Sequence, residues 1–524
     1  YSMKLNKRIN FFLLFIVLLL FIKTDYRLEP GIYCCKDDHD YYAHAETLII
    51  DLDFDYSNQF VGNEEQRFYY NGKTAPSAFI GAGLLSTPFL FVGNLIDNLF
   101  PNNEMFNFKI IFYSFSSIFY LIFTFLLLKK INKLLNSTYS SYSLYLFLLG
   151  SGIGFYVFER YSMSHIYEVF AVTLLIYHCI KFYKESNQYV AFSIPLLIML
   201  SLMTRWVNVY VLIIPLVISK LLNNKKNLLH KYKNFWLSSF LSIFVFLYHT
   251  YLVYGVVTLN PEFTYNTSGT IERYLGSSNS FGDFFWTNFK NLFLVFFGSE
   301  FGLFWFSPII FFGIYLTLKN FFINYKTSKV KTLLQLLCFL QVLSLVLIWK
   351  STGSSYGFRY VMNLAPLSIL ILLCNTKLNK IEILYLKAMS IFAILSVIYF
   401  ETTSKTQLSI EYINNIFDKN TKFSRPDYLT GYISSFLEID AYLKIFSQSF
   451  LGFIIFYVFI FFLGQESFYD ILSRLSLPYD NPDFQILIEK IINIEGSKVL
   501  TIILLVSYLS YTLINKTENH TLKK

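Results

Sequence analysis

The stretch CCKDDHDYYAHAETLII, Cys34 to Ile50, and its continuation DLDFDYSNQ to Gln59 hold the densest group of ionisable side chains in the sequence. The stretch follows the first long apolar run. Carboxylates are costly in hydrocarbon, so such a group beside a membrane-embedded segment lies in water or lines a polar cavity. We therefore expect it to belong to the first extracytoplasmic loop of a protein that crosses the membrane many times.

The composition supports a membrane protein. Of the 524 residues, 55% are hydrophobic, 20% aromatic and only 15% charged, which is far from the soluble average. The apolar runs leave room for about 13 spans of roughly 20 residues each. The net charge of +9 comes from lysines in short clusters between apolar runs. The positive-inside rule explains such clusters, so nucleic-acid binding is not expected.

A consistent topology follows when the basic clusters are placed in the cytoplasm. Residues 23–107 form a long first outer loop, in which the Pro- and Gly-containing segment Ala75 to Phe100 is expected to form interfacial helices. Residues 401–524 hold the C-terminal outer loop and the last two spans. The first four spans are expected at Asn10–Ile22, Phe108–Leu128, Tyr142–Phe158 and Ile166–Ile180, and the next two form a hairpin with its outer tip at 204–206. Five more are expected at Phe235–Val253, Leu303–Leu318, Leu333–Trp349, Val361–Cys374 and in a run that ends before Glu401. The last two are expected at Phe450–Leu463 and Val499–Ile514.

Polar residues from separate loops converge on the outer face in this topology. They stand at or just beyond the outer ends of expected spans: Asp37, Glu159, His165, Arg205, Glu300 and Arg359. Ionisable residues at such positions indicate a site on that face.

Asp37 is the first candidate for chemistry. It precedes Tyr41 by four residues, so on a helix the two share one face. A carboxylate with restricted hydration among aromatic side chains can act as a base toward a hydroxyl or an amine. Two alternatives are a solvated acidic loop and a divalent-cation site formed by Asp37, Asp38 and Asp40.

Six motifs in order carry a family resemblance. The pattern Asp37-Asp38-x-x-Tyr41 resembles the Asp-Glu-x-x-Tyr signature in the first outer loop of GT-C glycosyltransferases, such as protein O-mannosyltransferases and lipid A aminoarabinose transferases. The chain is most similar to bacterial GT-C-like membrane proteins with DGxGYYxYLxSLxxDxDLDFxNE in that loop. The further matching segments are YNGKTAPSAFIGAGLLSTPF (70–89), ERYSMSHIYEVF (159–170), TRWVNV (204–209), GSEFGLFWFSP (298–308) and SSYGFRY (354–360). Asp38 departs from the Glu of the signature, and nothing after Lys377 matches.

The resemblance implies a reaction and assigns roles. Such enzymes transfer a sugar, with inversion, from a polyprenyl-phosphate carrier to an acceptor on the outer face of the membrane. Asp37 is then the base, and Asp38 and Glu159 are further acidic residues of the catalytic site. Arg205, Arg359 and His165 are expected to bind the donor phosphate, since guanidinium groups match phosphate oxygens. Tyr41, Tyr42 and Tyr360 are expected to contact substrate.

The cationic residues also have interpretations without a role in catalysis or ligand binding. An arginine at the end of a span can extend to lipid phosphates, and His165 can be a helix-end histidine satisfied by the backbone.

The sequence thus predicts an all-α polytopic protein with GT-C architecture, a catalytic core over residues 1–400, and a C-terminal part over residues 401–524. It is expected in the bacterial inner membrane with its site on the periplasmic side. Its partners would be a polyprenyl-phosphate-linked sugar, a lipid-linked glycan or protein acceptor, and membrane lipids. No metal or cofactor is assigned. Alternatives are a transporter or flippase of lipid-linked sugars, which predicts ionisable residues at mid-membrane, and a non-catalytic subunit with the same fold.

Overall fold

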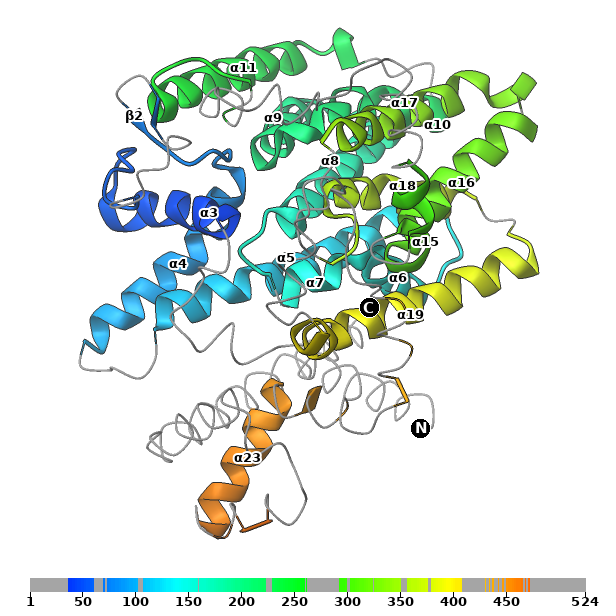
Figure 1. The fold of residues 1–524 in the computed structure, drawn as a ribbon. Helices are drawn as coiled ribbons and strands as arrows, with labels where there is room; N and C mark the ends of the chain where they lie inside the picture. Colours follow the sequence, from blue (N-terminus) through cyan, green and yellow to red (C-terminus); the bar gives the residue numbers. More distant parts are fainter. Residues whose placement is uncertain are drawn as a thin grey trace, which may run out of the picture. The chain divides into compact units, whose positions relative to one another are not determined.

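The computed structural model describes only part of the chain. The described residues are 36–60, 69–70, 73–101, 107–158, 160–222, 229–259, 261, 292–298, 302–323, 325–349, 356–375, 378–407 and 449–464, with isolated positions between 429 and 471. The expected spans at Asn10–Ile22 and Val499–Ile514 lie outside these residues. Within them the chain is mostly helical (Figure 1).

The described elements before residue 260 are mostly helices. Their bounds are α3 Lys36–Glu46, α4 Gly81–Leu99, α5 Phe108–Leu134, α6 Ser141–Leu148, α7 Gly154–Phe158, α8 His165–Glu185, α9 Gln188–Thr204, α10 Ile214–Leu221 and α11 Lys233–Tyr254. Short π-helical turns are η1 Thr47–Asp51 and η3 Leu149–Ile153, and short 3₁₀ helices are η4 Trp206–Ile213 and η5 Leu229–Lys231. A minimal antiparallel hairpin pairs β1 Tyr69–Tyr70 with β2 Lys73–Thr74.

The later elements are also helical. Their bounds are α15 Leu303–Phe306, α16 Pro308–Ile323, α17 Tyr325–Trp349, the 3₁₀ helix η6 Arg359–Leu364, α18 Ala365–Cys374, α19 Lys380–Gln407 and α23 Phe450–Leu463. The chain forms two compact units, one of 1–29, 101–107 and 439–524 and the other of Pro30–Phe100 and Phe108–Glu438. All site residues discussed below belong to the second unit. The division expected at residue 400 stays a prediction.

Helices occur at every expected span that falls within the described residues. Among those residues, five helices are long and apolar enough to cross a membrane, namely Phe108–Leu134, Ser141–Phe158, His165–Glu185, Lys233–Tyr254 and Lys380–Ile398. Five further apolar helices are shorter, at 10–17 residues. The chain is therefore a mostly helical membrane protein, and the larger number of spans stays a prediction.

Three expected boundaries differ from the structure. The span expected at Leu303–Leu318 is divided at Ser307 into α15 and α16. Pro308 begins α16, a position that its fixed φ and missing N–H suit well. Helix α17 begins at Tyr325, earlier than expected. The helix expected to end before Glu401 continues as α19 to Gln407.

The first-loop segment Ala75 to Phe100 forms one long helix. Helix α4 runs through Pro88 without a break, and its interfacial position stays a prediction. Asp97 near its end accepts hydrogen bonds from the backbone N–H groups of Phe108 and Lys109, at 3.0 and 3.1 Å. A carboxylate at this place satisfies the free donors at the start of α5 and favours the helix dipole.

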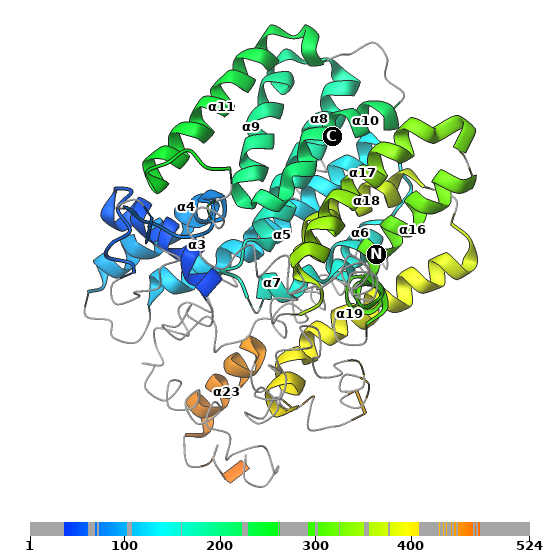
Figure 2. The same ribbon diagram turned by 45° about the horizontal axis from the view of Figure 1, so that its top comes forward.

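Neighbouring helices in the second unit pack in a row. Helix α4 packs on α5, α5 on α8, α8 on α9 and α9 on α11, while α16 contacts α17 and α18. Figures 1 and 2 show α11 alongside α9 and the short blue helix α3 beside α4. Gly83 explains the close approach of α3, because a Cβ there would lie 2.5 Å from Cβ of His44. Small residues allow such close helix contacts.

Candidate functional site

Helix α3 is fixed to the core through its acidic residues. The Oδ2 atom of Asp38 accepts hydrogen bonds from Nε and Nη2 of Arg160, at 3.0 and 2.6 Å, and both side chains are buried. The backbone oxygen of Asp38 accepts from Ser162 Oγ at 2.6 Å. Asp40 accepts instead from the backbone N–H and the hydroxyl of Ser77.

The two acidic side chains therefore have different partners, which does not favour the alternative of a cation held jointly by them. Within the described residues there is no group of three or more His, Cys, Asp or Glu that could hold a metal ion.

A buried histidine attaches the other face of α3. His44 Nδ1 lies 2.7 Å from the hydroxyl of Tyr56, and Nε2 lies 2.8 Å from the carbonyl oxygen of Ala78. Burial lowers the pKa of His44 to about 3, and His249 nearby acts in the same direction. His44 is thus neutral in the folded protein.

We expect the stability of the protein to fall in acid because of His44. Its pKa is 6.5 when unfolded and about 3 when folded, so the unfolded state binds the proton more strongly. The contribution is fully present above pH 6.5 and is lost as the pH falls toward 3. Between pH 6.5 and pH 5 the loss amounts to about 2 kcal/mol.

Thermal unfolding of the full chain in detergent at several pH values measures this effect. His44→Gln, whose amide can still donate to Ala78, should show a flatter pH dependence than the unchanged protein. The exposed His230→Gln is the matched control and should not flatten it. Equal slopes for all three proteins would contradict the assignment to His44.

The arginines expected to bind phosphate lie at the starts of two similar segments. Helix α9 ends at Thr204, Arg205 is extended at φ −161° and ψ 138°, and η4 then leads into α10. Arg359 is the first residue of η6, which leads into α18. A break between helices is therefore present at the expected position 204–206, and its place at the outer tip of a hairpin of spans stays a prediction.

An amide hydrogen bond joins these two segments. Asn363 of η6 donates from Nδ2 to Oδ1 of Asn208 in η4, at 2.8 Å, and both residues are fully buried. The hydroxyl of Tyr210 in η4 donates to the backbone oxygen of Asn363 at 2.5 Å. The segments that begin at Arg205 and Arg359 are thus connected directly.

Both arginines face the ring of Tyr360. The guanidinium carbon of Arg205 lies 5.5 Å from the ring centroid, and that of Arg359 lies 5.0 Å from it. Arg359 also donates from Nη2 to the Tyr360 hydroxyl at 3.2 Å, and its Nη1 lies 3.7 Å from the sulfur of Met163. Cations are attracted to aromatic faces, so one ring holds two positive groups.

A histidine and a glutamate complete the group around Arg205. His165 Nδ1 lies 2.8 Å from Oε1 of Glu168, and Arg205 Nη1 donates to the same oxygen at 3.3 Å. Glu168 is fully buried, and His165 is only 2% exposed. We call the residues His165, Glu168, Arg205, Arg359 and Tyr360 the arginine cluster.

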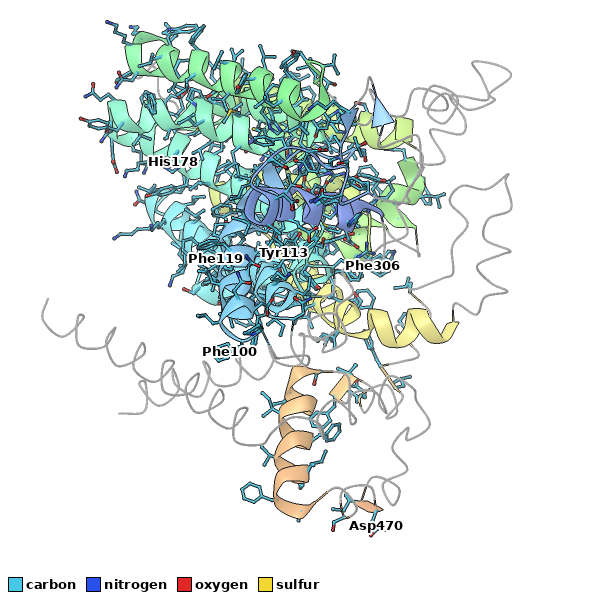
Figure 3. All side chains as sticks on the ribbon, turned by 90° about the vertical axis from the view of Figure 1, so that its left-hand side faces the viewer. Phe100, Tyr113, Phe119, His178, Phe306 and Asp470 are labelled. Atoms are coloured by element: carbon cyan, nitrogen blue, oxygen red, sulfur yellow. The ribbon has the colours of Figure 1, made fainter. Side chains whose placement is uncertain are left out.

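Helix α3 also faces this cluster. Tyr41 interacts electrostatically with Arg205. Tyr42, one position further along, instead forms an edge contact with Tyr113, with ring centroids 5.1 Å apart. Tyr113 is labelled beside α3 in Figure 3. Tyr41 is therefore near Arg205, whereas Tyr42 packs against Tyr113.

The sequence-derived site residues thus divide into three sets. Five of the expected contacts, Tyr41, His165, Arg205, Arg359 and Tyr360, are brought together. Asp37 lies in α3 four residues before Tyr41, but its side chain and all of Glu159 and Glu300 lie outside the described residues. Asp38 has Arg160 as a buried partner, and Tyr42 packs against Tyr113.

Sequence reasoning missed Arg160 and Glu168. Glu168 lies inside an expected apolar span, and an ionisable residue there is a signal for function. For Arg160 no local pattern indicates a partner 122 residues away.

The fold and this cluster define a helical membrane protein in which cationic residues from distant segments meet near α3. Comparison of the chain with family models, with curated proteins and with solved structures gave no match.

Proposed function

We propose that this protein is an inverting glycosyltransferase that uses a polyprenyl-phosphate sugar donor on the extracytoplasmic face of the bacterial inner membrane. One observation carries the proposal. Arg205 and Arg359, far apart in sequence, contact one tyrosine ring beside the helix that holds Asp37. Guanidinium groups match phosphate oxygens, so two of them beside one ring suit a phosphate.

Each residue has a place in the proposed reaction. Asp37 takes the proton of an acceptor hydroxyl or amine as that group attacks the anomeric carbon of the donor sugar. The new bond forms as the bond between the anomeric carbon and the phosphate oxygen breaks, and the phosphate leaves with the electron pair. Arg205 and Arg359 stabilise the developing negative charge in a poorly hydrated site. Tyr41 and Tyr360 contact the ligand, and the acceptor is a lipid-linked glycan or a protein.

Asp38 is placed as a positioning residue in this proposal. Its carboxylate is bound by Arg160, so it is poorly suited to accept a proton. By holding α3 against the residues before α8, the ion pair fixes the direction of the Asp37 and Tyr41 face. Tyr42 serves the same packing through Tyr113.

A transporter of lipid-linked sugars is the second candidate, and the geometry favours it less. The charged residues of the arginine cluster lie at the start of α8, after the end of α9 and at the start of η6. A transport pathway is expected to place ionisable residues near the middle of the membrane.

Loss of lipid-phosphate binding in arginine variants tests the proposal. Arg205→Gln and Arg359→Gln should each weaken binding of undecaprenyl phosphate by about 10- to 100-fold, since each removes a charge-assisted hydrogen bond. Native mass spectrometry of the detergent-solubilised full chain measures this binding. Lys220→Gln, an exposed cation at the end of α10, is the matched control and should bind normally.

Two outcomes would contradict the proposal. One is full binding of undecaprenyl phosphate by the double arginine variant. The other is competition by phosphatidic acid at equal potency, which would mean that the arginines only contact bilayer head groups.

A further inference from the structure

Glu168 connects two residues of the arginine cluster. Its Oε1 atom accepts from Arg205 Nη1 and is bound by His165 Nδ1. Its Oε2 atom is buried and has no hydrogen-bond partner among the described residues. The carboxylate stands in the first turn of α8, where the helix dipole favours a negative charge, and Arg205 adds a positive one.

This arrangement fixes the proton on His165. An ionised carboxylate can only accept hydrogen bonds, so the nitrogen that approaches it must carry the hydrogen. The distance from Nδ1 to Glu168 is 2.8 Å, whereas that from Nδ1 to Arg205 Nη1 is 3.4 Å. The shorter contact decides the tautomer, because hydrogen bonds weaken with distance. Neutral His165 therefore carries its hydrogen on Nδ1 and a lone pair on Nε2.

The Nε2 atom of His165, which carries a lone pair, is not a suitable hydrogen-bond partner for a phosphate oxygen. Nε2 of His165 has no hydrogen-bond partner among the residues that the structure describes. A second proton on the ring is opposed by the positive charge of Arg205, whose Nη1 lies 3.4 Å from Nδ1. A phosphate oxygen is itself an acceptor, so it requires a donor and not a lone pair. A hydroxyl group supplies the missing donor.

We propose that His165 accepts a hydrogen bond at Nε2 from a hydroxyl group of the ligand, next to the phosphate bound by Arg205 and Arg359. This inference rests on the proposed function and narrows its ligand to a lipid phosphate with a hydroxylated group attached, as in a glycosyl phosphate. It replaces the expectation that His165 binds the phosphate. Glu168 is the positioning residue that holds the tautomer.

The test compares three probes that share one lipid. They are undecaprenyl phosphate, undecaprenyl phosphoglucose and the same glucoside with its hydroxyl groups methylated. The unchanged full chain in detergent should bind undecaprenyl phosphoglucose about tenfold more tightly than its methylated form. A site that accepts a hydrogen bond from a hydroxyl group binds a ligand without that hydroxyl less tightly. Competition binding measured by native mass spectrometry gives the ratio.

His165→Asn is the central variant, because its amide can still donate to Glu168 but has no atom at the position of Nε2. It should reduce the tenfold preference to about twofold or less while undecaprenyl phosphate binds as before. Glu168→Gln should reduce the preference as well, and it serves if His165→Asn does not fold. His178→Asn is the matched control; it lies more than three turns further along α8, as labelled in Figure 3, and should keep the preference.

Three outcomes would overturn the inference. The first is equal binding of the unmethylated and methylated glucosides by the unchanged protein. The second is a preference that persists in both His165→Asn and Glu168→Gln. The third is a loss of undecaprenyl phosphate binding in His165→Asn as large as the loss of glucoside binding, which would make His165 a hydrogen-bond donor to the phosphate. Failure of the proposed function is a separate result, because it appears as unchanged lipid-phosphate binding in the arginine variants.

Discussion

Asp37→Asn is expected to reduce sugar transfer by about 10²- to 10⁴-fold, the usual contribution of a general base. Asparagine has nearly the same shape as aspartate but cannot take the acceptor proton at neutral pH. Asp37 lies in α3 four residues before Tyr41, the tyrosine that interacts with Arg205. Residues four apart on a helix share a face, so the proposal places the base toward the arginines.

The measurement is transfer from a radiolabelled undecaprenyl phosphoglucose to membrane acceptors, together with donor binding. The variant should bind the donor normally, since the arginines are intact. Asp53→Asn is the matched control, because Asp53 is an exposed carboxylate of the same acidic stretch and asparagine keeps the oxygen that accepts from Asp55 N. Unchanged transfer by Asp37→Asn would remove the catalytic assignment.

Asp38→Ala is expected to lower the free energy of unfolding by about 3–5 kcal/mol, the usual cost of breaking a buried ion pair. The carboxylate and the guanidinium of Arg160 are only 3% and 8% exposed. Removal of the carboxylate leaves the positive charge of Arg160 buried without its partner. Helix α3 also loses its strongest attachment to the residues before α8, so we expect Asp38→Ala to impair donor binding too.

Equilibrium unfolding of the purified protein in mixed micelles measures this loss. The double variant Asp38→Leu/Arg160→Met provides the control, because two apolar side chains of similar volume remove both charges together. The double variant should be nearly as stable as the unchanged protein, because replacing a buried ion pair by apolar side chains of similar volume is often neutral or stabilising. A loss below about 1 kcal/mol for Asp38→Ala would show that the pair behaves like an exposed one.

The helical part of the fold was predictable because the apolar runs are long and uninterrupted. The run that becomes α5 and the run that becomes α11 contain the expected spans within a few residues. Pro308 also indicated the break between helices at Ser307, although the residues on both sides of it form one continuous apolar run. The order and contacts of the helices were not predictable, since hydrophobic faces carry no information about their partners.

The candidate site was predictable only in part, because the sequence reveals individual residues but not which of them meet in the fold. Arg205 and Arg359 stand out because arginine is rare in this chain and each of them stands at the end of an apolar run. Their meeting at Tyr360 depends on tertiary packing. The pairing of Asp38 with Arg160 joins residues 122 positions apart, and no local pattern specifies it. Glu168 was visible as a charge within an expected span, three residues after His165.

The amide bridge between Asn208 and Asn363 has a consequence for ligand selection. Because it links η4 and η6, the segments that begin next to Arg205 and at Arg359, we expect the two cations to keep their spacing when the helices move. Two guanidinium groups at a fixed spacing favour an anion whose oxygen atoms match that spacing, and little conformational entropy is lost when such an anion binds.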